Sequence, residues 1–367
     1  MLLKLNSIIL YALVAFVLTI ALYPLMIRRL KSMKAGVRER SETATGDAAT
    51  ITKQFQDVKI GTPTMGGIVF FLVMSVMLVV SYFLHKLGII NNTLINRSET
   101  YILLVAFFGM GLLWLIDDYT KITTDKKIQW LGAKAKLVYM ICFSLFIGYR
   151  FNVKLGIHHI DIRPLPYTMI FDLYTLHLWD WSVMISPGYI AFAFIFVMAI
   201  TNAINISDGM DGLQWGMNLI VLSAMAIITF IFKRYLATTV VGIVVGTLLA
   251  YLRYNIYPAK IFMGDSGSLA LGGLISTLIF LISIKIWFIW PFLIVYALFR
   301  VELWSSFLQI TWKKIRKRKI FLVAPFHYYL QKVWISEPNI VMKFRLIQWV
   351  LASVMLIMIF YQISGVR

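Results

Sequence analysis

The chain has 367 residues, of which 60% are hydrophobic and only 14% are charged, and its mean hydropathy is +0.82. A soluble domain is roughly half apolar and a quarter charged, so this composition excludes an ordinary cytosolic enzyme. The formal net charge of +19 would suggest a nucleic-acid partner if the protein were soluble. In so apolar a chain it indicates basic loops beside a bilayer, and we expect a multi-spanning membrane protein with no nucleic-acid partner.

Long apolar runs predict the helices that cross the membrane, since a span needs about 20 mostly apolar residues. We interpret residues 1–367 as one polytopic domain. The ninth span carries Pro291, Arg300 and Glu302, which predicts a bend or a protein interface and a pairing of the two charges. The predicted spans are Ser7–Ile27, Gly66–Leu84, Tyr101–Ile116, Ala135–Tyr149, Ile185–Ile204, Trp215–Phe232, Ala237–Leu252, Leu269–Ile284, Trp287–Ile310 and Arg345–Ile363.

The loops between these spans predict the orientation. Most Lys and Arg residues lie in loops that share one face, which places that face in the cytoplasm and both termini in the periplasm. The basic run Lys313–Lys319 is interpreted as an orientation determinant that contacts anionic lipid. On the other face, Tyr167–Trp181 has a rough period of two residues and many aromatics, which predicts a small periplasmic hairpin or an interfacial aromatic layer. The predicted fold class is an all-α integral membrane protein of about ten transmembrane helices with cytoplasmic catalytic loops.

Three acidic segments fall on the predicted cytoplasmic face of a chain that has only 16 acidic residues. IDDYTK carries Asp117 and Asp118, NISDGMDGL carries Asp208 and Asp211, and IFMGDSGS carries Asp265. An acidic residue just inside the hydrocarbon costs about 2.5–3.5 kcal/mol, so such a cluster needs a counter-charge. Mg²⁺ is the natural candidate, because it is bound by one or two carboxylates and completed by water and substrate phosphates.

The spacing of these acids predicts separate roles for them. Neighbouring helical residues do not face each other, so Asp117 and Asp118 are expected to have different partners. Asp208 and Asp211 are three residues apart, and the glycines that follow them predict a loop that opens into the next helix.

Glycines surround the acids, as in GTPTMGG (Gly61–Gly67) and on both sides of Asp265. They can bring backbone N–H groups close to a diphosphate, although glycines near spans also serve close helix packing. His327 lies in APFHYYL on the same face, where an imidazole could contact phosphate or sugar.

At these residues the chain resembles the phospho-N-acetylmuramoyl-pentapeptide-transferase family, which belongs to the bacterial polyprenyl-phosphate N-acetylhexosamine-1-phosphate transferases. The resemblance covers nearly the whole chain, and its specificity comes from an ordered set of motifs. These are KIGTPTMGG (Lys59–Gly67), IDDYTK (Ile116–Lys121), NISDGMDGL (Asn205–Leu213), YNIYPAKIFMGDSGSLALGG (Tyr254–Gly273), VELWSSFLQI (Val301–Ile310) and the tail from APFHYYL to Arg345, including Trp334 and Glu337.

The resemblance implies ten transmembrane helices in the bacterial inner membrane, commonly as a homodimer. It also implies an Mg²⁺-dependent transfer of phospho-N-acetylmuramoyl-pentapeptide from its UDP-linked donor to undecaprenyl phosphate, giving lipid I and UMP. Whether an aspartate first forms a covalent intermediate stays open. We favour direct attack, because the acceptor phosphate is already an anion.

The same resemblance implies roles for individual residues. Asp265 would be the Mg²⁺ ligand, Asp117 and Asp118 would orient or deprotonate the lipid phosphate, and Lys121 and Lys136 would neutralise phosphate charge. The other implied substrate-binding residues are Asn205, Asp208, Asp211 and Phe262 in the nucleotide pocket, with Asn255 nearby, and Lys59, Thr64 and His327.

Two departures from the family pattern are visible. The family usually has three consecutive histidines where this chain has His327, Tyr328 and Tyr329, and a frequent histidine before the first motif is Gln56 here. Tyrosine can form hydrogen bonds but is neutral near pH 7, so a role that needs imidazole at the second or third position is in doubt.

Three other functions are compatible with parts of the pattern. A sister transferase would move N-acetylglucosamine-1-phosphate to the polyprenyl phosphate and would differ in its nucleotide-sugar preference. A transporter or flippase would need carboxylates near mid-membrane and inverted repeats, which the sequence does not show. A lipid-binding scaffold would have no need of the aspartates.

Overall fold

The computed structural model describes residues 2–37, 59–123, 132–155, 176–177, 184–185, 187–286, 289–333 and 335–365. Almost all of this part of the chain is helical, as the sequence predicts. The helices are α1 (Leu2–Ser32), α3 (Gly67–Lys86), α4 (Ser98–Thr123), α5 (Ala133–Leu155), α6 (Pro187–Ile206), α7 (Leu213–Ile231), α8 (Tyr235–Asn255), α9 (Asp265–Ile286), α10 (Trp290–Val295), α11 (Ala297–Arg316), α12 (Phe326–Lys332) and α13 (Glu337–Gly365).

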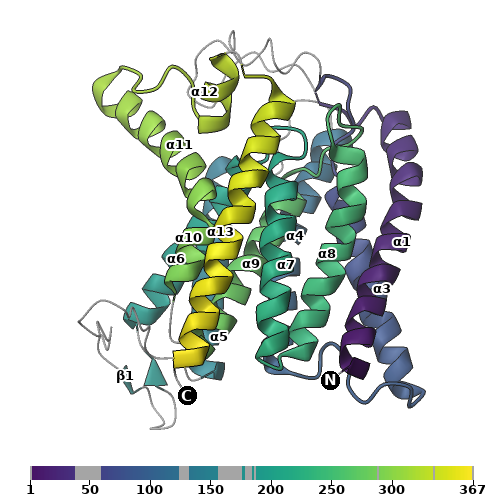
Figure 1. Cartoon of the computed structure of the whole chain (residues 1–367). Helices are drawn as coiled ribbons and strands as arrows, with labels where there is room; N and C mark the ends of the chain where they lie inside the picture. Colours follow the sequence, from purple (N-terminus) through teal and green to yellow (C-terminus); the bar gives the residue numbers. More distant parts are fainter. Residues whose placement is uncertain are drawn as a thin grey trace.

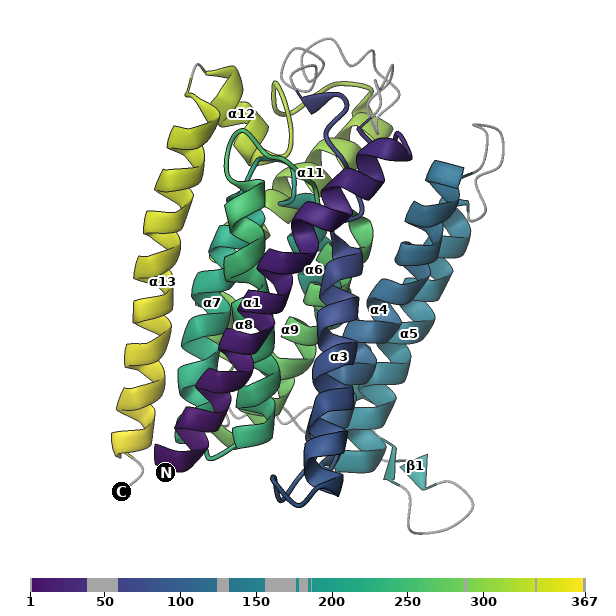
Figure 2. The ribbon, with the colours of Figure 1, turned by 90° about the vertical axis from the view of Figure 1, so that its right-hand side faces the viewer.

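The long helices run side by side in one bundle, and both termini lie at the same end of it (Figures 1 and 2). The short helix α12 lies at the opposite end, which we call the α12 end (Figure 1). Within the described residues, nine helices are long and apolar enough to cross a membrane, namely α1, α3 to α9 and α13. The prediction of a polytopic all-α membrane protein is therefore confirmed.

The ninth predicted span, Trp287–Ile310, is bent, as its proline and charged residues predict, and its described part forms two helices. The chain forms the six-residue helix α10, with Pro291 in its first turn, and then α11, and the two meet at Tyr296. Proline fits the first turn of a helix better than its interior, where it removes a backbone hydrogen bond, and this favours a new start at Pro291. The ninth crossing is thus broken, and Figure 1 shows α11 diverging from the bundle toward the α12 end.

The central helix of the bundle is α9. The buried share of its apolar window is 89%, against 22% for α1 and for α13. Close packing depends on small residues: a Cβ at Gly273 would lie 2.6 Å from the Ala106 carbonyl oxygen of α4, and one at Gly272 would lie 2.7 Å from the Cα of Thr201 in α6. In lipid, where apolar contact alone gives little driving force, such packing holds helices together. The start of α9 is therefore fixed at the centre of the α12 end.

A small hairpin precedes α6. Strands β1 (Leu176–His177) and β2 (Met184–Ile185) pair in antiparallel fashion. The hairpin that the sequence predicts over Tyr167–Trp181 is therefore present but extends further toward α6, and the rest of that range lies outside the described residues.

Candidate functional site

At the α12 end, backbone hydrogen bonds join the segment before α3 to the segment before α9; we call this contact the backbone junction. The Gly66 N–H donates to the Phe262 carbonyl at 2.8 Å, and the Gly67 N–H donates to the Met263 carbonyl at 2.9 Å. In return the Phe262 N–H donates to the Pro63 carbonyl at 2.8 Å. The amides of Gly66 and Gly67 are therefore bonded to carbonyls and not open to an anion, which corrects the diphosphate interpretation of these two glycines.

Close approach explains the glycine at position 67. A Cβ there would lie 2.7 Å from Ser266 Oγ and 2.8 Å from the Gly267 backbone nitrogen, closer than real Cβ atoms come. The motif glycine thus lets the start of α3 contact the start of α9, which carries Asp265.

The adjacent aspartates at the end of α4 have different partners, as their spacing predicts. Lys136 Nζ of α5 lies 2.5 Å from Asp117 Oδ2, and the side chain of Asp117 is only 2% exposed. Asp118 Oδ2 accepts the Ser266 N–H of α9 at 3.3 Å. Asp117 thus ties α4 to α5, and Asp118 reaches the first turn of α9.

Asp265 is the first residue of α9, where a negative charge is favoured by the N–H groups and dipole of the helix. Asn205 Nδ2, at the end of α6, donates to Asp265 Oδ1 at 3.2 Å and to Ser268 Oγ at 2.7 Å. Because Asp118 contacts the same helical turn, the ends of α4 and α6 converge on the start of α9.

This oxygen-rich group suits a hard cation. Mg²⁺ takes carboxylate and amide oxygens and usually keeps water and substrate phosphates as further ligands. Across the described ranges, no group of three or more His, Cys, Asp or Glu side chains is arranged to hold a metal. The residues that fit Mg²⁺ by their chemistry are Asp265 and Asp118.

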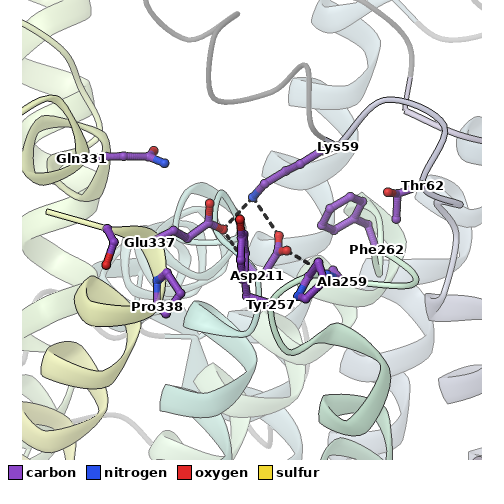
Figure 3. A pocket seen from close by; sticks show the side chains of 11 residues that line it. Lys59, Thr62, Asp211, Tyr257, Ala259, Phe262, Gln331, Glu337 and Pro338 are labelled. Carbon is purple, nitrogen blue, oxygen red and sulfur yellow. Dashed lines mark hydrogen bonds and ion pairs between the residues drawn. The ribbon is translucent and has the colours of Figure 1, made fainter. Parts of the chain in front are cut away.

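A pocket of about 210 Å³ includes Phe262, three residues before Asp265, in its lining (Figure 3). Its walls come from four separate segments of the chain, with an aromatic ring on one side and an amide on the other (Figure 3). The pocket is lined by Lys59, Thr62, Asp211, Tyr257, Pro258, Ala259, Phe262, Gln331, Ser336, Glu337 and Pro338.

Lys59 joins two carboxylates in the pocket. Its Nζ lies 2.7 Å from Asp211 Oδ1 and 2.7 Å from Glu337 Oε1, and 5.7 Å from the centre of the Phe262 ring. Burial alone would lower the pKa of Lys59, but the charges of Glu337 and Asp211 outweigh it and raise that pKa. The ammonium therefore stays charged at neutral pH, at the centre of the pocket.

The same carboxylates also fix the backbone around them. Asp211 Oδ2 accepts the Ala259 N–H at 2.9 Å, and Glu337 Oε1 accepts the Asp211 N–H at 2.7 Å. Asn255 is buried behind the pocket, where its Oδ1 accepts the Gly212 N–H at 3.0 Å and its Nδ2 donates to the Ile261 carbonyl. Asn255 thus supports the pocket from behind.

Asp208 lies apart from the pocket lining. Its Oδ1 accepts the Trp215 Nε1–H at 2.7 Å. Burial raises the pKa of Asp208 to about 7, which the Trp215 hydrogen bond partly offsets. The nearby charges of Asp265 and Asp211 raise this pKa as well, and that of Lys59 lowers it.

His327 is fully buried at the start of α12. Glu302 Oε2 lies 2.9 Å from His327 Nδ1 and accepts the His327 N–H at 3.3 Å. The expected pairing of Glu302 with Arg300 is therefore wrong, since Glu302 is paired across to α12.

The structure brings together most residues that the sequence singles out, but in two groups. Of the predicted nucleotide-pocket residues, Asp211 and Phe262 line the pocket, whereas Asn205 contacts Asp265. Thr64 lies in the loop before α3 and donates its N–H to the Ala35 carbonyl at 2.9 Å, while Thr62 lines the pocket.

Three further positions complete the comparison with the sequence. Lys121 lies in the last turn of α4 with its side chain outside the described part, and Gln56 lies outside it altogether. In the sequence Glu337 is only part of the matching tail, and its one signal is an acid directly before a proline, as at a helix start.

The class of the protein follows from comparison with known families. Residues 100–284 match the model of glycosyl transferase family 4. This match runs from α4 to α9 and includes the whole acidic group at the start of α9. The fold and site therefore define a multi-pass membrane glycosyl transferase.

Relatives identify the family within that class. The chain is 30% identical to the phospho-N-acetylmuramoyl-pentapeptide-transferase of Staphylococcus carnosus, covering 92% of this chain and 94% of that one. It is 32% identical to the protein of the same name from Staphylococcus aureus (91% and 94%) and 29% identical to that from Clostridium acetobutylicum (95% and 98%). The chain belongs to the phospho-N-acetylmuramoyl-pentapeptide-transferase family.

Proposed function

We propose that the chain transfers phospho-N-acetylmuramoyl-pentapeptide from its UDP-linked donor to undecaprenyl phosphate, giving lipid I and UMP for peptidoglycan synthesis. The observation that carries this proposal is the segment 262–265. Phe262 at one end lines the pocket with Lys59, and Asp265 at the other end begins α9, whose first turn contacts Asn205 and Asp118. A nucleotide in the pocket would have its diphosphate within reach of the carboxylates.

The proposed donor site uses three kinds of contact. The Phe262 ring offers a face for the uracil base, and Lys59 offers a positive charge among neutralising carboxylates. Gln331 on the other side of the pocket offers an amide to the ribose or sugar (Figure 3). This arrangement of an aromatic wall and a few convergent polar groups is typical of sites for small polar ligands.

The proposed reaction is a direct displacement. An oxygen of the lipid phosphate attacks the sugar-linked phosphorus, a new P–O bond forms, and the anhydride bond to UMP breaks, so that UMP leaves with the bridging oxygen. The attacking phosphate is an anion and needs no strong base, so the protein contributes mainly positioning and charge. Asp117 and Asp118 orient the acceptor, and Lys136 offsets phosphate charge.

We propose Mg²⁺ as the cofactor. Asp265 would hold the ion, which would supply positive charge for phosphoryl transfer. Asn205 holds the Asp265 carboxylate in place for this role.

The proposed setting is the bacterial inner membrane with the α12 end in the cytoplasm, since UDP-linked donors are made there. The basic run Lys313–Lys319 extends from α11 into that face and would contact anionic lipid, as the positive-inside rule favours. A homodimer, common in the family, is also part of the proposal.

UMP release by the detergent-purified protein tests the function. Undecaprenyl phosphate and Mg²⁺ are supplied with either UDP-N-acetylmuramoyl-pentapeptide or UDP-N-acetylglucosamine, each with and without EDTA. We expect turnover of the muramoyl donor alone, abolished by EDTA. Turnover of the other donor would assign the chain to the sister transferases, and no turnover in a folded sample would contradict the proposal.

A further inference from the structure

The contact between α11, α12 and the loop after α6 has no role in the reaction as described so far. Glu302 on α11 and His327 on α12 are both 0% exposed. A buried carboxylate is costly unless it is paired and hydrogen-bonded. Glu302 Oε2 meets this need twice, through the His327 backbone N–H and through His327 Nδ1. Glu302 Oε2 already accepts the His327 backbone N–H, so it is an acceptor toward the imidazole as well. We therefore assign the proton of the second hydrogen bond to His327 Nδ1.

The other side of the imidazole packs against the acidic loop. A Cβ at Gly209 would lie 2.4 Å from His327 Nε2 and 3.1 Å from Tyr328 Oη, so only glycine fits beneath this ring. Tyr328 Oη also donates to the Gly209 carbonyl at 3.1 Å. Two neighbouring residues of α12 thus hold one residue of the loop.

Gly209 is the residue through which α12 can act on the site. It directly follows Asp208 and lies two residues before Asp211, whose carboxylate binds Lys59 in the pocket. Moving Gly209 would therefore move Asp211. His327 itself is not among the residues that line the pocket, and its Nε2 is buried without a hydrogen-bond partner in the described structure.

We propose that Glu302 and His327 form a positioning pair that fixes Gly209, and through it Asp211, and that His327 does not contact the donor. Glu302 sets the orientation of the imidazole, the imidazole and Tyr328 hold Gly209, and the loop holds Asp211 against Lys59. This inference rests on the proposed function, because it takes the Lys59 pocket as the nucleotide site.

The test exploits the fit between ring and glycine. His327→Ala removes the ring, Gly209→Ala adds a methyl group where the ring lies, and the double variant places the methyl group in the vacated space. Calorimetric titration with UMP measures affinity for the pocket, and the unfolding midpoint monitors the fold. Gly132→Ala is the matched control, because nothing lies within 4 Å of a Cβ at that glycine.

A positioning role predicts rescue. We expect each single variant to weaken UMP binding about tenfold and the double variant to return to within about threefold of the wild type, since contacting sites are not additive. Glu302→Gln, which keeps the shape and an acceptor oxygen, is expected to weaken binding about threefold. The control is expected to bind UMP as the wild type does.

Two results would overturn the inference. One is UMP affinity that stays at the wild-type value in His327→Ala, and the other is a double variant as weak as the product of the two single effects. If His327→Ala lowers the unfolding midpoint too far to be measured, Glu302→Gln carries the test, and unchanged UMP affinity in that variant counts against the pair. Because UMP is the product with either sugar donor, a wrong donor assignment leaves these outcomes intact.

Discussion

The two ends of the bundle are held together by different kinds of contact. At the α12 end, backbone hydrogen bonds join the segments before α3 and α9, and Lys59 joins the α6–α7 loop to α13. At the end that carries the termini, an ion pair joins Arg234, before α8, to Glu99 at the start of α4. Asp211 and Glu337 are buried and Lys59 is 14% exposed, whereas Arg234 and Glu99 are each about a quarter exposed.

This difference indicates which residues contribute to both stability and activity. A buried carboxylate that loses its partner leaves an uncompensated charge, which is strongly destabilising. An exposed pair is screened by water and contributes little. Substitutions at the α12 end should therefore change activity, stability or both, and those at the other end should change neither by much.

The largest expected effect is on activity alone. Asp265→Asn should reduce turnover roughly a thousandfold, because it removes a carboxylate that we propose as the Mg²⁺ ligand, while the amide keeps the shape of the side chain. UMP release measures the loss, and thermal unfolding should be nearly unchanged. Near-normal Mg²⁺-dependent turnover of the variant would show that the assigned role of Asp265 is wrong.

The second effect joins stability and substrate affinity. Lys59→Met leaves Asp211 and Glu337 buried without their shared cation, which should lower the free energy of unfolding by about 3 kcal/mol and raise KM for the nucleotide donor. Lys260→Met is the matched control, since Lys260 is exposed on the same end. Equal unfolding midpoints for the two variants would contradict the buried-charge argument.

The third effect tests the backbone junction. Gly67→Ala places a methyl group 2.8 Å from the Gly267 nitrogen, so the starts of α3 and α9 must separate, which should cost about 1–3 kcal/mol of stability. Turnover should fall as well, because Asp265 moves with α9. Chemical denaturation of this variant is compared with that of Gly132→Ala, which adds a methyl group without a contact. An unfolding midpoint equal to that of the wild type would show that the backbone junction can accommodate the methyl group.

The sequence predicted the long apolar helices and part of the site, since Lys59, Asp211 and Phe262 do line the pocket. Apolar runs predicted α3 to within two residues at its end, and their alternation placed the acidic segments on one end of the bundle. The break at Tyr296 was less predictable. Pro291, Arg300 and Glu302 indicated a disturbed span, but which residue ends a helix depends on packing against its neighbours.

The sequence alone could not predict which distant segments pair with each other. Lys59 and Glu337 are 278 residues apart, and the order of the spans does not say which loops touch at the α12 end. Glu302 was assigned to Arg300, two residues away, because charges on one segment are the simplest partners to propose. The structure pairs it with His327, 25 residues away, since α12 folds back over α11.

A smaller effect concerns pH. Asp208 has an ordinary pKa of 3.8, and burial raises it to about 7 in the folded protein, so the folded state binds more protons than the unfolded state between these values. The contribution of Asp208 to stability is therefore fully present below pH 3.8 and is lost as the pH rises to about 7. Thermal unfolding in EDTA from pH 5 to 8 should show this slope for the wild type and a flatter one for Asp208→Asn.

The smallest effect belongs to the other end of the bundle. Because Arg234 and Glu99 are partly exposed, a double-mutant cycle of Arg234→Ala and Glu99→Ala should give a coupling energy below about 1 kcal/mol. UMP release should stay at the wild-type level in all three variants, since no contact of this pair reaches α12. A coupling of several kcal/mol, or lost turnover, would mean that the two ends are linked more tightly than their exposure indicates.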